Sequence, residues 1–230
     1  MQSMGFYGAS NAPDWKEKIM KLGELKIECL MVMDADADDI SMDNLATYEN
    51  NDSYSDYMRK MPGAINRGLD RMATLKKLPI KEHILTNGKK EGAYLVFNLK
   101  EVPNFRSIKR VRVLQGEHLI NNIDYLYEGK HLMIPNIYDG EITLYYYPSS
   151  PAVTREMGND EEVDIPDELA RLLPYYVKSD IFETEEPSLA SQARNKFESA
   201  LEEITLNEED SFDCTINKVY RMDIWEYQQV

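Results

Sequence analysis

The hydrophobic pattern of this chain changes its period twice, and that change restricts the folds that it can adopt. Up to about residue 80, apolar residues recur at steps of three and four, the period of an amphipathic helix. From about residue 81 to 153, short runs of β-branched and aromatic residues alternate with turn signals, a pattern typical of antiparallel strands. The helical period then returns. This order predicts a helical part whose sequence is interrupted by a β part.

Two helices are expected before the β part. The first spans about Asp14–Met33 and leads into a polar stretch, 34–55, which we interpret as a long loop. The second spans about Asp56–Lys76, and Pro62 predicts that this helix either begins near the proline or kinks there. Its apolar stripe consists of Met58, Met61, Ile65, Leu69 and Met72.

The β part contains short candidate strands that are separated by turn signals such as Asn87-Gly88 and Asp139-Gly140. Strands of this length fold back on one another, so we expect a compact sandwich or barrel-like sheet. The candidate strands are Tyr94–Leu99, Ile108–Leu114, Tyr125–Tyr127, His131–Ile134 and Glu141–Tyr147.

The last third begins with an acidic linker, Glu156–Asp164. A helix is then expected over Pro166–Phe182, with a bend at Pro174, followed by a second helix over Pro187–Ile204. These two helices predict a helical hairpin. The stretch beyond residue 207 has no sustained period, although it is rich in aromatic and aliphatic residues.

The predicted fold class is therefore α+β, with a four-helix bundle-like core, an inserted small antiparallel β domain and an extended C-terminal tail. The expected boundaries are 14–80 and 160–206 for the helical core, 81–153 for the β domain and 207–230 for the tail.

The formal net charge of -15 argues against independent binding to nucleic acid, because neutralising phosphates requires clustered lysine and arginine. An acidic wall can still line a conduit for DNA, since it keeps DNA from adhering.

No apolar run reaches the roughly 18 residues of a membrane span, and the first residues lack the order of a signal peptide. We expect a soluble protein that is made in the cytoplasm. Cys29 and Cys214 lie in separate segments, so neither a disulfide framework nor a zinc site is predicted.

An aspartate-rich run suggests calcium at first, because Asp34, Asp36 and Asp38 match the first ligand positions of an EF-hand loop. The match ends there: Asp39 stands where the loop needs glycine, and Leu45 stands where it needs the bidentate glutamate. A solvated acidic loop is the better interpretation of this run.

Catalytic patterns are also incomplete. Asn87-Gly88-Lys89-Lys90 lacks the earlier glycine and the following Ser or Thr of a phosphate-binding loop. The histidines, His83, His118 and His131, show no paired metal-ligand spacing. We expect neither an enzyme nor a bound metal or cofactor.

One basic cluster stands out in this acidic chain. Lys109, Arg110 and Arg112 lie on a predicted strand, where alternation places Arg110 and Arg112 on the same face. This face either meets DNA or an acidic neighbouring subunit, or is simply a solvated sheet surface.

The segment Ile165–Ile204 resembles the C-terminal helical hairpin of head-tail adaptor (connector) proteins of tailed bacteriophages. The similarity consists of a proline-led helix entry, an apolar helix with an internal proline, an acidic break and a closing Lys-Phe-Glu motif at 196–198. Upstream, Ala64–Leu69 is similar to the family's second helix, and the strands ending at Pro148 are similar to the β insertion of its larger members. The motif residues of the hairpin are Pro166, Leu169, Leu173, Pro174, Tyr176 and Phe197.

This resemblance implies a structural virion protein that forms a ring, typically of twelve copies, beneath the portal at the head-tail junction. Its expected partners are other copies of itself, the portal protein and the next neck or tail protein, with DNA passing transiently through the ring and no membrane. Assembly would take place in the host cytoplasm.

The aromatic tail has too much apolar surface to stay solvated in a finished particle. The family resemblance suggests that it docks on the portal, and the alternative is that it folds back onto its own subunit. The expected portal anchors are Phe212, Ile216, Val219, Tyr220, Ile224, Trp225 and Tyr227.

Two other functions compete with the adaptor. One is a tail-completion or stopper protein, or a neck protein close to the tail tube. The other, from a different class, is a calcium- or ligand-binding module with an Ig-like insertion. The four expected helices argue against a stopper, which is usually mostly β, and the binding module does not explain the terminal hairpin.

Overall fold

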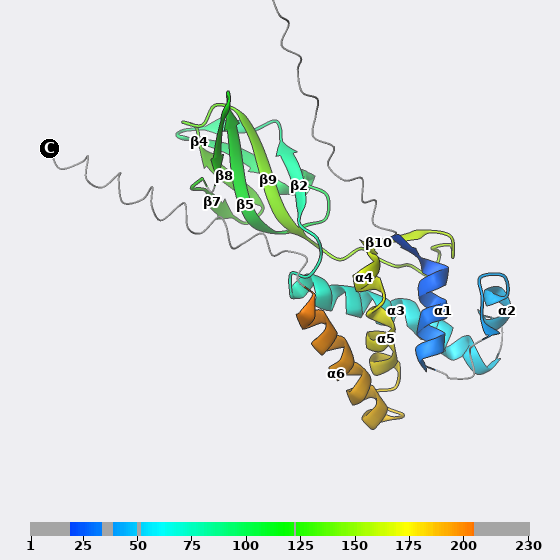
Figure 1. Ribbon diagram of the computed structural model, residues 1–230. Coiled ribbons are helices and arrows are strands. Elements are labelled where there is room, and N and C mark those ends of the chain that lie inside the picture. Colours follow the sequence, from blue (N-terminus) through cyan, green and yellow to red (C-terminus); the bar gives the residue numbers. More distant parts are fainter. Residues whose placement is uncertain (1–18, 34–38, 50–51, 122, 205–230) are drawn as a thin grey trace, which may run out of the picture.

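The computed structural model describes residues 19–33, 39–49, 52–121 and 123–204 (Figure 1). The helices are α1 (Leu22–Met33), α2 (Leu45–Glu49), α3 (Asp52–Thr74), α4 (Asp167–Ala170), α5 (Leu173–Ile181) and α6 (Pro187–Glu203). The strands are β1 (Ile19–Lys21), β2 (Lys81–Leu85), β3 (Lys89–Glu91), β4 (Tyr94–Asn98), β5 (Phe105–Gln115), β6 (His118–Asn121), β7 (Leu126–Glu128), β8 (His131–Pro135), β9 (Glu141–Pro148) and β10 (Glu162–Pro166).

The helical part is organised around α5, which packs against α1, α3 and α6 (Figure 1). Helix α3 buries most of its predicted stripe: Met61, Ile65, Leu69 and Met72 are fully buried, and Met58 is partly buried against the same core. The core continues into a two-stranded antiparallel sheet, β1 with β10, which contributes Met20, Val163 and Ile165.

The expectation of a four-helix bundle-like core is wrong. The structure is mixed, with three antiparallel sheets, and one of them completes the core of the helical part. Helix α5 has only 9 residues, about 14 Å at 1.5 Å per residue, which is too short for a long bundle seam. The β part also holds more strands than expected, because it consists of two four-stranded sheets.

The β part is a sandwich of two antiparallel sheets with strand orders β2-β9-β5-β6 and β3-β4-β8-β7. The inner faces of the two sheets share one core, which includes Phe97, Val111, Leu132 and Leu144. This core is separate from the core of the helical part, and the two parts are seen side by side in Figure 1. Three of the strands, β2, β3 and β6, were not expected. Each is short and polar along at least half its length, so the period-2 signal of a strand is weak there.

The structure differs from the sequence predictions at two prolines, Pro62 and Pro174. Pro62 lies inside α3, which continues through it, so the alternative that the helix begins there is wrong. Pro174 does not bend a long helix. It stands in the first turn of α5, where its missing N–H costs no hydrogen bond, and Arg171 and Leu172 separate α5 from α4.

The expected acidic linker and the expected long loop also contain structure. The end of the linker forms β10, which pairs with β1, and the loop contains α2. Both elements are short and depend on partners distant in sequence, so local periodicity does not reveal them.

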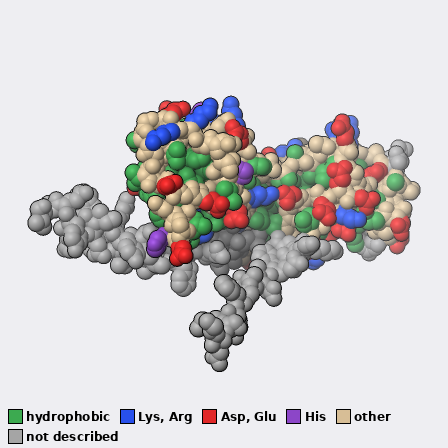
Figure 2. All heavy atoms as spheres, turned by 90° about the horizontal axis from the view of Figure 1, so that it is seen from above, with side chains coloured by type: hydrophobic (Ala, Val, Ile, Leu, Met, Phe, Trp, Pro, Cys, Tyr) green, Lys and Arg blue, Asp and Glu red, His purple; other side chains and the backbone are tan. Residues whose placement is uncertain are grey.

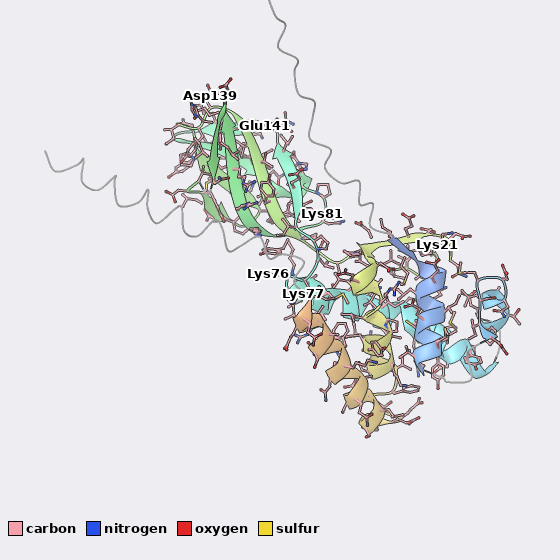
Figure 3. All side chains as sticks on the ribbon, in the orientation of Figure 1. Lys21, Lys76, Lys77, Lys81, Asp139 and Glu141 are labelled. Atoms are coloured by element: carbon pink, nitrogen blue, oxygen red, sulfur yellow. The ribbon has the colours of Figure 1, made fainter. Side chains whose placement is uncertain are left out.

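The two parts meet where α3 ends (Figure 3). The amide N–H of Lys77 donates to the carbonyl of Met72 (3.0 Å) and that of Lys76 to Ala73 (3.1 Å), with Lys76 at φ +57°. This is a Schellman cap, which turns the chain sharply out of the helix toward β2. Two further interactions link the β part to the helical part: Lys81 forms an ion pair with Asp164, and Arg106 donates a hydrogen bond to Thr74.

Within the described ranges, no helix is both long and apolar enough to cross a bilayer.

Candidate interaction surface

The outer face of the sheet β2-β9-β5-β6 carries the basic cluster found in the sequence. Strand β9 alternates strictly: Ile142, Leu144 and Tyr146 are buried in the sandwich, so Tyr145 and Tyr147 lie on the opposite face. On β5, Val111 and Val113 are fully buried, which places Arg110 and Arg112 on that outer face too. The prediction that these two arginines share a face is confirmed.

Tyr145 organises the two arginines. Strand register sets Arg110 opposite Tyr145 and Arg112 opposite Thr143. The guanidinium carbons of Arg110 and Arg112 lie 4.7 and 4.8 Å from the centroid of the Tyr145 ring, and Arg112 Nη1 donates to the tyrosine hydroxyl at 3.4 Å. Cation–π contacts of this kind contribute about 0.5–1 kcal/mol each at exposed sites. One ring therefore holds two like charges side by side.

Lys109, the third member of the cluster, lies at an irregularity in the pairing of β5 with β9, between Ile108 and Arg110. Such a bulge inserts an extra residue and re-aims its neighbours. The bulge explains why two consecutive residues of β5, Lys109 and Arg110, are cations. Beyond them, inward-facing and outward-facing side chains alternate as expected.

A further cation reaches the same face from the helical part. The ammonium of Lys76 lies 4.9 Å from the ring centroid of Tyr147, two residues along β9 from Tyr145. Its position follows from the Schellman cap of α3. We refer to Lys76, Arg110, Arg112, Tyr145 and Tyr147 as the Arg–Tyr face.

Apolar and acidic residues border the Arg–Tyr face. Ile84 on β2 is 49% exposed, and Leu114 and Leu119 form an exposed cross-strand pair on the other side of β9. The carboxylates of Glu82 and Glu141 stand on the same outer side, next to Tyr145 and Leu114 in the register. A surface with this mixture suits a partner that brings both carboxylates and an apolar side chain.

Seen from above in Figure 2, lysine and arginine side chains gather along one margin of the β part, and acidic side chains are spread over both parts. The whole chain carries a net charge of -15, so a concentration of cations on one sheet is a local exception.

A second cationic region lies beside the junction. Lys100, Arg106 and Lys130 line a hollow of about 360 Å³ together with Phe105 and Tyr127. Arg106 is held there by its hydrogen bond to Thr74 (2.9 Å).

The histidines partly converge. His83 and His131 line one hollow of about 210 Å³ with Glu91 and Glu101. His118 lies on β6 and is not among its lining residues. Nevertheless, no group of three or more metal-ligating side chains is assembled among the residues that the structure describes.

The hairpin motif residues form the core rather than a surface. All of them are buried, and the rings of Tyr176 and Phe197 meet edge to face at 5.0 Å. Pro166 ends β10 and precedes α4 instead of starting the long helix expected. The buried motif residues are Pro166, Leu169, Leu173, Pro174, Tyr176 and Phe197.

The second segment of the resemblance, Ala64–Leu69, contacts the hairpin directly. A Cβ added at Gly68 would come within 2.8 Å of Leu173 Cδ2, so any larger residue would force the Leu173 side chain to shift where α3 approaches α5. Arg67 pairs with Asp180 on α5, and one turn later Arg71 makes a bidentate pair with Glu198 on α6.

Asn66, in the same segment, holds the chain that returns from the β part. Its Nδ2 donates to the carbonyl of Val153 (2.7 Å), and its Oδ1 accepts from the Val153 amide (2.8 Å). Sequence reasoning gave no role to Asn66, Tyr145 or Lys76. For Tyr145 a partial signal existed, since the alternation of β9 places it on the face opposite the buried Ile142, Leu144 and Tyr146.

Two predicted sites fall outside the described residues. The acidic run 34–38 is one, although Asp39 next to it is described and its carbonyl accepts from Asn44. The other is the set of portal anchors, Phe212, Ile216, Val219, Tyr220, Ile224, Trp225 and Tyr227.

No protein-family model matches this chain, and a search of curated proteins finds no match either.

Proposed function

We propose that this protein is a structural subunit of a bacteriophage head-tail junction, which assembles as a ring beneath the portal and surrounds the passage for DNA. The proposal rests on the resemblance of Ile165–Ile204 and Ala64–Leu69 to head-tail adaptors. The single observation that supports it best is that these two segments, about 100 residues apart in sequence, pack against each other.

The contacts between α3 and the hairpin involve Gly68 of the first segment and Arg71, which lies just beyond that segment. Gly68 allows the close approach to Leu173, and Arg71 binds Glu198 of the Lys-Phe-Glu motif with both nitrogen–oxygen distances at 3.0 Å. Tyr176 and Phe197 fill the space behind them.

Charge supports the same function. A net charge of -15 repels DNA, which suits a channel through which DNA must move without adhering. In the proposed particle the ring is docked at the capsid vertex and offers a platform to the next neck or tail component.

The test is to mix the full-length protein with portal rings of the phage that encodes it and to image the mixture by electron microscopy. Rings stacked on portals are the expected result. A protein that stays monomeric and ignores the portal contradicts the proposal.

The tail can be tested in the same assay with matched variants. Deleting Phe212–Val230, or substituting Trp225→Ala with Tyr227→Ala, is expected to abolish portal binding because buried aromatic anchors dominate interface energetics. The control, Gln228→Ala with Gln229→Ala, changes two polar residues of the same tail and should bind normally. Normal binding by the truncated protein would remove the tail from the proposed interface.

A further inference from the structure

The described chain ends close to the Arg–Tyr face. The carbonyl of Ile204 accepts a hydrogen bond from Lys77 Nζ at 2.7 Å, which holds the end of α6 at the junction. The neighbouring Lys76 lies over Tyr147 of the face. Figure 3 shows both lysines at the end of α3, where the helical part meets the β part. The residues that follow Ile204 therefore start beside this face.

The sequence that follows is acidic before it becomes aromatic. Glu208, Glu209, Asp210 and Asp213 come first, with Phe212 between the last two, whereas the tryptophan and tyrosines follow from 220 onward. We call Glu208–Asp213 the acidic segment. It brings both carboxylates and an apolar side chain, the mixture that suits the Arg–Tyr face and its apolar border.

The reach of the chain fits as well. From Ile204 to Glu208 and Asp210 the chain can extend about 13 to 20 Å, at roughly 3.3 Å per residue. Along β9, the distance from Tyr147 to Thr143, which lies opposite Arg112, is about 13 Å by the same rise. The two lengths are comparable, so a chain that starts at the Tyr147 end of the face can carry the carboxylates of 208–213 to Arg110 and Arg112.

We propose that the acidic segment Glu208–Asp213 binds the Arg–Tyr face of its own chain. Carboxylates pair with the guanidinium groups that Tyr145 holds in position. Phe212 packs on the apolar border near Leu114 and Ile84, so this contact assigns it to its own subunit and leaves Ile216, Val219, Tyr220, Ile224, Trp225 and Tyr227 as the portal anchors. The contact fixes where the aromatic end, 219–227, leaves the subunit. It does not depend on the ring, so portal binding and this contact can fail separately.

The test uses the native Cys214, which directly follows the acidic segment. Cys29 is fully buried and burial raises its thiol pKa, so it reacts slowly. A nitroxide attached to Cys214 of the full-length, isotope-labelled protein should broaden the amide NMR signals of residues 110–112 and 143–147. A Cys214→Ser protein treated in the same way controls for labelling at Cys29.

The variant that breaks the proposed contact is Glu208→Lys with Glu209→Lys and Asp210→Lys, which should abolish the broadening. The matched control is Glu183→Lys with Glu185→Lys and Glu186→Lys, since it makes the same change of charge in the exposed loop between α5 and α6. The control should broaden like the unchanged protein. High salt should also weaken the broadening, because about 1 M salt shortens the screening length to about 3 Å.

Three results would overturn the proposal. One is the absence of broadening on β5 and β9. Another is broadening centred on Lys100, Arg106 and Lys130, which would assign the segment to the other cationic region. The last is broadening that appears only when nitroxide-labelled and isotope-labelled molecules are mixed, which would assign the face to the tail of a second copy.

Discussion

Asn66 is the residue whose substitution tests the junction most directly. Its side chain makes two hydrogen bonds to the backbone of Val153, of 2.7 and 2.8 Å, and Val153 is only 3% exposed. Asn66→Ala leaves one N–H and one carbonyl without this partner. At about 1–1.5 kcal/mol for each partly buried group, the free energy of unfolding should fall by about 2–3 kcal/mol.

The loss can be measured by urea denaturation followed by far-ultraviolet circular dichroism, and amide exchange at Val153 should accelerate in parallel. Asn195→Ala, an exposed position on α6, is the control and should change stability by less than about 0.5 kcal/mol. If Asn66→Ala behaves like the control and the Val153 amide keeps its protection, the side chain does not hold the returning chain.

Asn66→Asp tests the two hydrogen bonds individually, because it should keep the one from the Val153 amide and remove the one to the Val153 carbonyl. The carboxylate can still accept from the Val153 amide, but its second oxygen then faces the Val153 carbonyl, which also accepts only. The folded state therefore favours the protonated acid and raises its pKa above the unfolded value. The variant should be most stable at low pH and lose stability as pH rises through that folded pKa.

Three other predictions concern the two cores. Phe197→Ala removes a fully buried ring and should lower the free energy of unfolding by about 3–5 kcal/mol in the same urea assay, and a smaller loss than about 1 kcal/mol would contradict its place in the core. Burial raises the pKa of Tyr146 above the ordinary 10.0, so the unfolded chain ionises first and stability should fall as pH rises beyond that value. Tyr146→Phe should flatten this alkaline slope and cost about 1 kcal/mol at neutral pH, because the hydrogen bond to the Pro103 carbonyl is lost. In a Cys214→Ser protein, Cys29 should resist thiol reagents until urea unfolds the helical part, and rapid reaction under native conditions would show that its burial is transient.

Where the hydrophobic period was strong, the sequence predicted local structure well. The stripe of α3 lies in the core, and α6 begins at the predicted proline. The alternation of β5 placed Arg110 and Arg112 on one face, since a strand has a side-chain period of two whatever its neighbours are.

The arrangement of these elements was less predictable. A helical stripe says only that a partner exists, so the pattern did not reveal that β1 and β10 complete the core or that α5 is too short for a bundle. Pro174 illustrates the same limit, because a proline signals an irregularity but does not decide between a bend and a new helix.

The features of the Arg–Tyr face were likewise predictable only in part. The sequence alone determined its charge and the common face of its two arginines, because both follow from residue type and strand period. Only the tertiary structure brought Tyr145 beneath the arginines and Lys76 over Tyr147, and held the end of α6 beside them. The contact of Lys76 with Tyr147 joins the helical and β parts, and the geometry of all these contacts depends on strand register and on the helix cap, which no local pattern encodes.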